Sequence, residues 1–483
     1  MTTLQNTFFE QIDEIRCEWH VPGLALCVVQ NGQVAFCAGS GYRDVEHQLP
    51  VTPHTRLAIG STTKAFTTLA LGILVDSGKL DWDTPVRRYL PDFGMYDFFA
   101  SERITPRDLV THCSGLPRYD TLWYFANLDR REMIRRIRYL EPSYDFRQVY
   151  QYSNLMFAAA GYLIEQISGV TWEEFVTSHI LQPLKMTDSS TGLPNSVGFA
   201  DFAFPYMEQN GSAVQISFFN KLAIGPAGSI SSSASDLAKW LLLHLNGGEH
   251  AGQSLISKEH LRQMHSPQMV IRDIGQLSPG DRLGGFPEIG PSYYGLGWRL
   301  NTYRGHNMVH HSGSIDGFNA MVSFLPNDDM GIAVLTNADN TLLPYPLIFS
   351  IYDRLLQMEP IDWLHRVSQM LAESEINPED PQENNRVADT HPSHLCLQDY
   401  AGNFEHPAYG IFSVVFENDR LLAHYYDQTF PLDHHHYDVF TFAFSHRQEK
   451  VPVSFMGDRS GRINQLTIPL ETAVKDIVFI RKD

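Results

Sequence analysis

Ser61 and Lys64, in the stretch Ser61-Thr-Thr-Lys64, have the residue types and spacing of a serine nucleophile and its base. Three residues apart on a helix, the two side chains lie on one face, so the lysine nitrogen can reach the serine hydroxyl. A lysine in an apolar site has a lowered pKa, and the free N–H groups at a helix start favour a developing anion. About two such pairs are expected by chance in this length. The structural alternative is an N-capping serine with a lysine that snorkels to the surface.

Tyr152 and Asn154 form the only Tyr-x-Asn sequence of the chain. A tyrosine close to a lysine can move a proton to a leaving group or from a water molecule. An asparagine two residues on can orient the lysine and hydrogen-bond a substrate amide. The structural alternative is a buried tyrosine beside an asparagine that caps a helix.

The stretch His311-Ser312-Gly313, followed by Ser314, is the third candidate, on a strand that we expect at an edge of a sheet. A small residue and a glycine there let a substrate backbone approach closely. The Ser314 N–H can then complete an oxyanion hole. His-x-Gly also occurs at His250-Ala-Gly252, so the position within the strand region selects the first copy.

The run His434-His435-His436 raises the question of a metal site. Consecutive residues of a strand point to opposite faces, so at most His434 and His436 could share an ion. Without a further ligand set in the sequence, we expect a structural role, no metal and no organic cofactor. The cysteines form no CxxC pair, which indicates buried thiols in a reducing compartment. They are Cys17, Cys27, Cys37, Cys113 and Cys396.

The elements that would position these residues follow from the pattern of apolar residues. Gly23–Tyr42 predicts a β-hairpin around Asn31-Gly32, the best signal for a tight hairpin turn. Residues 58–78 predict a helix entered through Ser61, within a mainly helical region of residues 80–260. The clearest helical patterns of that region are 154–168 and 235–245.

Strand patterns return from Tyr294, and we expect them to share one antiparallel sheet with the early hairpin, flanked by helices, as an α+β domain of residues 1–365. The four runs are YGLGWRL (294–300), HNMVHHSG (306–313), FNAMVSFL (318–325) and MGIAVLTN (330–337). The polar, proline-containing residues 366–395 predict a linker. Residues 396–483 alternate apolar and polar side chains and predict an all-β domain of about eight short strands, a small barrel or a sandwich.

The totals exclude several classes of function. The chain has 483 residues, with 36 Lys and Arg against 55 Asp and Glu, a net charge of −19 at pH 7. An acidic chain repels polyphosphate, so nucleic acid is not an expected partner. The apolar runs are too short to span a membrane, and no basic amphipathic anchor is visible. The N-terminal stretch lacks the features of a signal peptide, so we expect a cytoplasmic protein.

In their order and spacing, the three motifs resemble those of the serine β-lactamase and penicillin-binding protein superfamily. The tyrosine makes the class C-like branch, with the S12 peptidases and CubicO-type hydrolases, the nearest match, over about residues 5–360. Residues 397–483 are similar to the lipocalin-like domain that follows the hydrolase in some relatives. Further landmarks are LVTHCSGLP at 109–117, ILQPLKM at 180–186, PAGSISSSASDLAKW at 226–240 and YGLGW at 294–298.

The resemblance implies a serine hydrolase with a β-lactamase/transpeptidase-like fold that forms an acyl-enzyme. Ser61 would be the nucleophile, with its N–H in the oxyanion hole. Lys64 and Tyr152 would move the protons, and Asn154 and the 311–313 segment would contact the substrate. Relatives with a similar tail suggest small peptides or amides as substrates, including ones with D-amino acids. The tail of such relatives packs on the hydrolase of the same or a neighbouring subunit, so a homo-oligomer is expected.

One departure and two alternatives remain. Many relatives carry a lysine where His311 stands, and because histidine is mostly neutral near pH 7, a strict need for a substrate carboxylate is not expected. The same machinery could act on esters or transfer acyl groups. A non-catalytic binding protein could keep the fold, although the presence of Ser61, Lys64, Tyr152 and Asn154 together counts against it.

Overall fold

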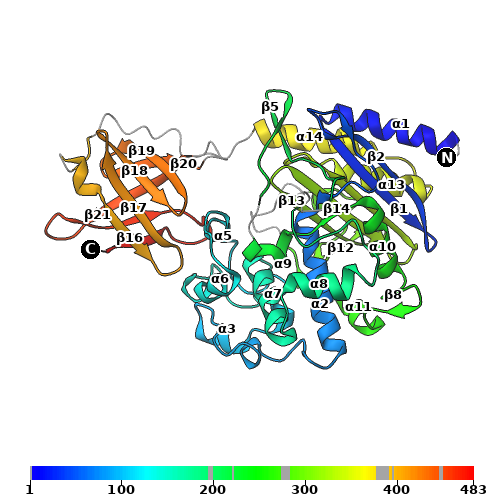
Figure 1. Cartoon of the computed structure of the whole chain (residues 1–483), viewed down its shortest axis with the longest axis horizontal. Coiled ribbons are helices and arrows are strands. Elements are labelled where there is room, and N and C mark those ends of the chain that lie inside the picture. The colour runs from blue at the N-terminus through cyan, green and yellow to red at the C-terminus, as the bar shows by residue number, and fades with distance from the viewer. Residues whose placement is uncertain are drawn as a thin grey trace.

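The computed structural model describes residues 3–193, 199–219, 222–272, 283–376, 391–393, 396–444 and 450–482. A large α+β domain and a small β-barrel stand side by side, and the N-terminus lies at the end of the α+β domain that is remote from the barrel (Figure 1). This architecture confirms the fold class expected from the sequence.

A nine-stranded antiparallel sheet forms the centre of the α+β domain. Its order is β10-β11-β12-β13-β14-β15-β1-β2-β3, so the N-terminal hairpin pairs with the last strand of the sheet in the sequence, as expected. Asn31 and Gly32 both have positive φ, which the tight hairpin turn requires. The strands are β1 (Gly23–Gln30), β2 (Gln33–Asp44), β3 (Leu49–Pro50), β10 (Met269–Val270), β11 (Tyr293–Tyr294), β12 (Arg299–Tyr303), β13 (His306–Ile315), β14 (Phe318–Leu325) and β15 (Met330–Thr336).

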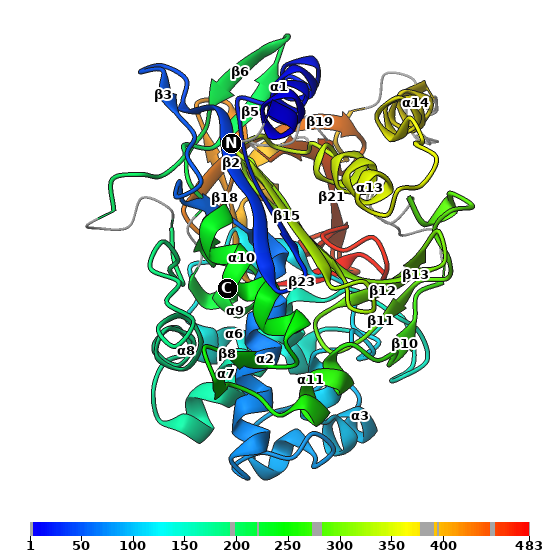
Figure 2. The ribbon, with the colours of Figure 1, turned by 90° about the vertical axis from the view of Figure 1, so that its right-hand side faces the viewer.

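Both faces of the sheet are covered, which explains why its central strands are apolar throughout. Along β1, Leu24 and Leu26 enter one core, while Ala25 and Cys27 enter the other, with the two-residue period of a strand. One face packs against α1 (Thr3–Glu18) and α13 (Pro344–Leu355), with α14 (Trp363–Ile376) beside α13. The opposite face packs against α10 (Ala234–Leu245), with α2 (Thr63–Asp76) on the same side (Figure 2).

The segment between β3 and β10 supplies the helical region of the domain. Its longest helix is α7 (Asn154–Ser168), which has the predicted bounds and ends at Gly169 with φ of 78°. The other elements are β4 (Leu57–Ala58), η1 (Gly60–Thr62), η2 (Val86–Arg88), α3 (Phe98–Arg103), α4 (Pro106–Leu109), α5 (Asp120–Tyr124), α6 (Arg130–Arg136), η3 (Ile137–Tyr139), α8 (Trp172–Val176), η4 (Thr177–Leu181), β5 (Tyr206–Gln209), β6 (Ser212–Gln215), η5 (Leu222–Ile224), α9 (Gly225–Gly228), β7 (Ser231–Ser232), β8 (Glu249–His250), β9 (Gln253–Ser254) and α11 (Lys258–Met264). η6 (Leu283–Gly285) follows β10.

Eight antiparallel strands after η7 (Leu397–Tyr400) close into the barrel, β16 pairing with β23. Phe479 points inward and its neighbours Val478 and Ile480 outward, as the alternating sequence requires. The strands are β16 (Gly402–His406), β17 (Gly410–Glu417), β18 (Arg420–Tyr425), β19 (Gln428–His436), β20 (Val439–Ala443), β21 (Lys450–Gly457), β22 (Ile463–Ile468) and β23 (Ile477–Lys482). The predicted eight-stranded barrel is confirmed.

The barrel contacts the α+β domain along the start of α5. Glu471 Oε2 accepts a hydrogen bond from the Tyr119 N–H at 2.7 Å, and the Leu470 carbonyl accepts one from Thr121 Oγ1 at 3.0 Å. These contacts fix α5 from outside its own domain.

The structure corrects three expectations. Strand β13 is not at a sheet edge, because it pairs with both β12 and β14, although its pairing with β12 ends at His310. Helix α14 runs to Ile376, so residues 366–376 of the predicted linker are helical, while 377–390 and 394–395 lie outside the described residues. Cys17 and Cys396 are exposed rather than buried. Within the part of the chain that the structure describes, no helix is long and apolar enough to cross a membrane.

Candidate active site

Two glycines, Gly60 and Gly313, allow strand β13 to pack closely against the turn that carries Ser61. Gly60 has φ of +51°, and a Cβ atom on it would lie 2.9 Å from Ser314 N. A Cβ atom on Gly313 would lie 2.0 Å from the Ile59 carbonyl oxygen and 2.8 Å from Ser61 N. The close approach that Gly313 permits is therefore to the turn that carries Ser61. The same packing places Ser314 N next to Gly60 and Ser61 N next to Gly313.

Lys64 is fully buried on α2, and its nitrogen contacts three oxygen atoms. Nζ lies 2.9 Å from Ser61 Oγ, 2.8 Å from Asn154 Oδ1 and 2.8 Å from the Ala227 carbonyl oxygen. Burial lowers the pKa of Lys64 well below its usual value, and the charge of Arg118 lowers it further. The serine and lysine meet as their spacing predicts.

Asn154, at the first position of α7, is oriented by Asp120 at the start of α5. Its Nδ2 donates to Asp120 Oδ1 at 3.2 Å, which turns Oδ1 of Asn154 toward Lys64. Asp120 also accepts from Arg118 Nε at 2.6 Å and from Trp123 Nε1 at 2.9 Å. A chain of polar contacts therefore runs from Arg118 through Lys64 to Ser61.

Tyr152 is held by the loop around His112. The two rings stack with their centroids 4.2 Å apart. His112 Nδ1 accepts from the Ser153 N–H at 3.0 Å, and its carbonyl oxygen accepts from the Gln151 N–H at 2.7 Å. His112 thus clamps the residues on both sides of Tyr152.

The surroundings of Tyr152 keep its hydroxyl protonated. Burial raises its pKa to about 12, while a hydrogen bond with Ser61 and the charges of Arg118 and Arg299 act in the opposite direction. Lys64 Nζ lies 4.7 Å from the ring centroid, and the Arg118 guanidinium carbon 5.1 Å from it. At neutral pH the Tyr152 hydroxyl is therefore protonated, and both Lys64 and Arg118 lie close to its ring.

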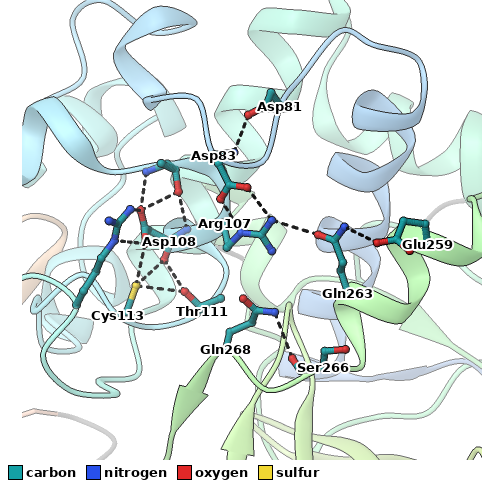
Figure 3. A network of polar contacts seen from close by, with 12 residues as sticks. Asp81, Asp83, Arg107, Asp108, Thr111, Cys113, Glu259, Gln263, Ser266 and Gln268 are labelled. Atoms are coloured by element: carbon teal, nitrogen blue, oxygen red, sulfur yellow. Dashed lines mark hydrogen bonds and ion pairs between the residues drawn. The ribbon is translucent and has the colours of Figure 1, made fainter.

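A polar network around the buried Asp108 links the His112 loop to Arg147, and Figure 3 shows the contacts of Asp108 with Thr111 and Cys113. The buried Asp108 carboxylate accepts hydrogen bonds from Thr105 N at 2.8 Å and from the Arg147 guanidinium at 2.7 and 2.8 Å. The Arg147 N–H in turn donates to the Cys113 carbonyl at 2.7 Å. A charge-assisted, bidentate pair of this kind fixes geometry as well as adding stability.

His311 is buried and neutral. Its Nδ1 is 2.6 Å from the Ser312 carbonyl, which can only accept, so Nδ1 carries the proton. Nε2 then accepts from the Tyr294 hydroxyl at 3.0 Å. Burial lowers the pKa of His311 well below its usual value, and the charges of Lys64 and Arg299 add to this effect.

A pocket with an empty volume of about 770 Å³, part of it open to solvent, lies beside Ser61. Of the predicted site residues, Ser61, Asn154 and Ser314 are among the described residues that line it. Its apolar wall consists of Trp123, Tyr124, Leu193, Phe219, Ile224 and Ile315, and Asp316 adds a carboxylate.

Sequence reasoning missed three positioning residues. His112, Arg118 and Asp120 hold Tyr152 and Asn154 from loops far away in the chain. The signal for His112 is present, because it lies inside the landmark stretch LVTHCSGLP.

In the histidine run of the barrel, His434 Nε2 lies 3.0 Å from the Tyr437 carbonyl oxygen.

The chain is similar to several known proteins. An unguisins hydrolase of Aspergillus campestris is 29% identical over 453 residues, which cover 87% of this chain and 79% of that protein. The octameric penicillin-binding protein homologue from Pyrococcus abyssi has a TM-score of 0.66 at 24% identity, over 98% of this chain and 99% of that one. SurE with D-Leu has a TM-score of 0.54 at 18% identity, over 99% of both chains.

Two family models match the chain. One, described as a domain of unknown function (DUF3471), matches residues 385–481, the region of the barrel. The other, described as Beta-lactamase, matches residues 8–346, which contain every residue of the site above. Since the Beta-lactamase model matches more than half of this chain, the chain belongs to the Beta-lactamase family and is a serine hydrolase.

Proposed function

We propose that this protein hydrolyses small peptides or amides through an acyl-enzyme formed on Ser61. The observation that carries the proposal is the surroundings of Lys64 Nζ. Asn154 Oδ1 and the Ala227 carbonyl can only accept hydrogen bonds. A neutral lysine has two N–H bonds and one lone pair, so with both N–H bonds engaged the lone pair faces the Ser61 hydroxyl, 2.9 Å away. That is the arrangement of a base that takes the serine proton.

In acylation, Ser61 Oγ attacks the carbonyl carbon while its proton passes to Lys64 Nζ. The N–H groups of Ser61 and Ser314 stabilise the oxyanion. The C–N bond breaks as the leaving amine takes the proton of Tyr152, which Lys64 then replaces. In deacylation, water attacks the acyl carbon and gives its proton to the same pair, and Ser61 regains a proton as the acid leaves.

The remaining predicted site residues would bind the substrate around this centre. Asn154 lines the pocket and uses one of its two amide N–H bonds for Asp120, so the other is left for a substrate carbonyl. The strand segment His311-Ser312-Gly313 would lie beside the substrate. Because His311 is neutral, it offers no fixed charge for a substrate carboxylate, which favours amides without a free C-terminus near the scissile bond.

Relatives support the substrate class and an oligomeric state. One relative is named an unguisins hydrolase, and SurE, which shares the fold, is known with D-Leu. We therefore propose small peptides, including ones with D-residues, as substrates. The Pyrococcus abyssi relative is octameric, and we propose that this chain also forms a homo-oligomer. Its mass in solution, by light scattering, tests that proposal.

The activity is tested with D-alanine p-nitroanilide, L-alanine p-nitroanilide, p-nitrophenyl butyrate and a chromogenic cephalosporin, with Ser61→Ala as the control. We expect D-anilide cleavage that Ser61→Ala abolishes, and labelling of Ser61 by a fluorophosphonate probe. Fast ester cleavage with inert anilides would instead indicate an esterase or acyltransferase. No labelling and no turnover would contradict the hydrolase mechanism.

A further inference from the structure

The pocket beside Ser61 ends, at the turn between β13 and β14, in a carboxylate next to aromatic rings. Asp316 lines the pocket together with Trp123, Tyr124 and Phe219. The ring centroids of Tyr124 and Phe219 are 5.1 Å apart, and those of Trp123 and Phe219 are 5.8 Å apart, so the three rings form one cluster. A carboxylate beside aromatic faces attracts an ammonium group both by charge and by cation–π interaction.

The negative charge of Asp316 is available to a ligand. Its Oδ2 accepts a hydrogen bond from the Tyr124 hydroxyl at 2.5 Å, a neutral donor that fixes the carboxylate without cancelling its charge. In the described part of the chain, no ion pair joins Asp316 to a lysine, arginine or histidine. A second carboxyl group lies nearby. Burial raises the pKa of Asp339, and repulsion from Asp316 raises it further.

The turn that carries Asp316 is held in place before any ligand arrives. Gly317 has φ of +77°, and a Cβ atom on it would lie 2.2 Å from Pro205 Cβ, so the turn packs tightly on Pro205. The Gly317 N–H donates to Asp339 Oδ1 at 3.4 Å. A carboxylate fixed in this way binds without the cost of ordering its loop.

Two groups would orient the substrate. Tyr152, which protonates the leaving group in the proposed mechanism, would face the leaving part. Its neighbour Arg118 is already paired with Asp120 at 2.6 Å, so it adds no free charge there. Asp316 follows Ser314 by two residues, so it lies within about 7 Å of the proposed oxyanion hole along the strand. We place the acyl part of the substrate toward Asp316.

We propose that Asp316, with the rings of Trp123, Tyr124 and Phe219, binds a cationic amino group in the acyl part of the substrate. The preferred substrates then carry a free amine close to the carbonyl that Ser61 attacks, as an amino-terminal residue of a peptide does. This inference rests on the proposed hydrolase function.

The test compares D-alanine p-nitroanilide with N-acetyl-D-alanine p-nitroanilide, which lacks the cation but has the same leaving group. For the wild type, we expect kcat/KM for the free amine to exceed that for the acetylated form by about ten- to a hundred-fold, the range of one charged hydrogen bond. In Asp316→Asn, which retains an oxygen for the Tyr124 hydroxyl, the ratio falls toward one. The wild-type ratio also falls as pH rises through about 8, where an α-amino group loses its proton.

The matched control is Asp427→Asn, which makes the same change at an exposed position of the barrel and keeps the wild-type ratio. A wild-type ratio near one, or a full ratio in Asp316→Asn, would overturn the role of Asp316. Labelling of Ser61 by the fluorophosphonate probe would in that case still support the hydrolase. Absence of both labelling and turnover would contradict the proposed function and this inference together.

Discussion

At the scale of single residues, burial sets the protonation states of the site. The same loss of water lowers the pKa of Lys64 and raises that of Tyr152, because burial disfavours a charged lysine and a charged tyrosinate alike. Both groups are driven toward their neutral forms, a base and an acid side by side. In the proposed mechanism Lys64 acts as a neutral base, so kcat/KM should rise with pH as this lysine loses its proton.

Asp120 and Arg118 act on the pKa of Lys64 in opposite directions, so replacing each should shift the pH profile in opposite directions. Asp120 raises the pKa of Lys64 and Arg118 lowers it. Asp120→Asn should therefore move the rising limb of the pH profile of kcat/KM to lower pH, and Arg118→Gln should move it to higher pH. The measurement is a pH series of kcat/KM for both variants and the wild type. Shifts in the same direction would show that Lys64 does not govern the limb.

The effect of Tyr152 on kcat/KM should depend on whether the leaving group must take up a proton. p-Nitroaniline must be protonated to leave, whereas p-nitrophenolate leaves as an anion. Tyr152→Phe should then lower kcat/KM for an anilide by about a hundred-fold or more, and for a p-nitrophenyl ester by much less. Equal losses on both substrates, measured side by side, would argue for a role of Tyr152 in activating Ser61 instead.

At the scale of elements, the sequence predicts what local patterns encode. The hairpin of β1 and β2, helix α7 and strand β14 follow from short periodic patterns and appear where expected. Helix α13 is not among the predicted elements; Pro344 and Pro346 lie in its first turn, where proline is well accommodated. Ser61 and Lys64 meet within one helical turn, which spacing reveals.

The rest of the site depends on contacts that no local pattern contains. Asp120 reaches Asn154 across 34 residues of sequence, and His112 reaches Ser153 across 41. Their roles depend on how the loops pack, and the sequence alone gives no measure of that. The same reason explains why β13 as a whole is an interior strand that pairs with both β12 and β14, while residues 311–315 pair with β14 alone and keep the expected free edge.

The packing of β13 on the nucleophile turn gives a prediction at this scale. Gly313→Ala places a methyl group 2.0 Å from the Ile59 carbonyl oxygen, so strand and turn must separate and the oxyanion hole must widen. We expect a loss of kcat of about a hundred-fold, the size of the effect when one oxyanion donor is removed. Gly285→Ala, which meets nothing within 4 Å, is the control. Similar kcat values for both variants would refute the packing argument.

At the scale of the whole molecule, the barrel supports one wall of the site. Glu471 holds the Tyr119 N–H, and the next residue, Asp120, orients Asn154. Phe444 of the barrel also stacks on Phe125, with centroids 4.3 Å apart. Asn154 is thus coupled, through the start of α5, to a loop of the barrel.

We therefore predict that Glu471→Ala lowers kcat/KM by about ten-fold, the equivalent of one lost hydrogen bond to a charged group. Glu471→Gln, which keeps an acceptor oxygen, should recover most of the activity. Glu417→Ala removes an exposed glutamate from β17 and serves as the control. If Glu471→Ala and Glu417→Ala have equal kinetics, the barrel does not position α5.

The pairing of β1 with β15 has a consequence for folding during synthesis on the ribosome. Strand β1 leaves the ribosome about 300 residues before its partner, an interval of about 15 to 60 s at a synthesis rate of about 5–20 residues per second. Throughout that time the nascent hairpin offers an unpaired apolar edge, the kind of surface that recruits chaperones or aggregates. The hydroxyl of Ser61 emerges early, but in the proposed mechanism it has no complete oxyanion hole until β13, which carries Ser314, is translated near the end of the domain. Synthesis itself therefore delays activity until the fold is almost complete.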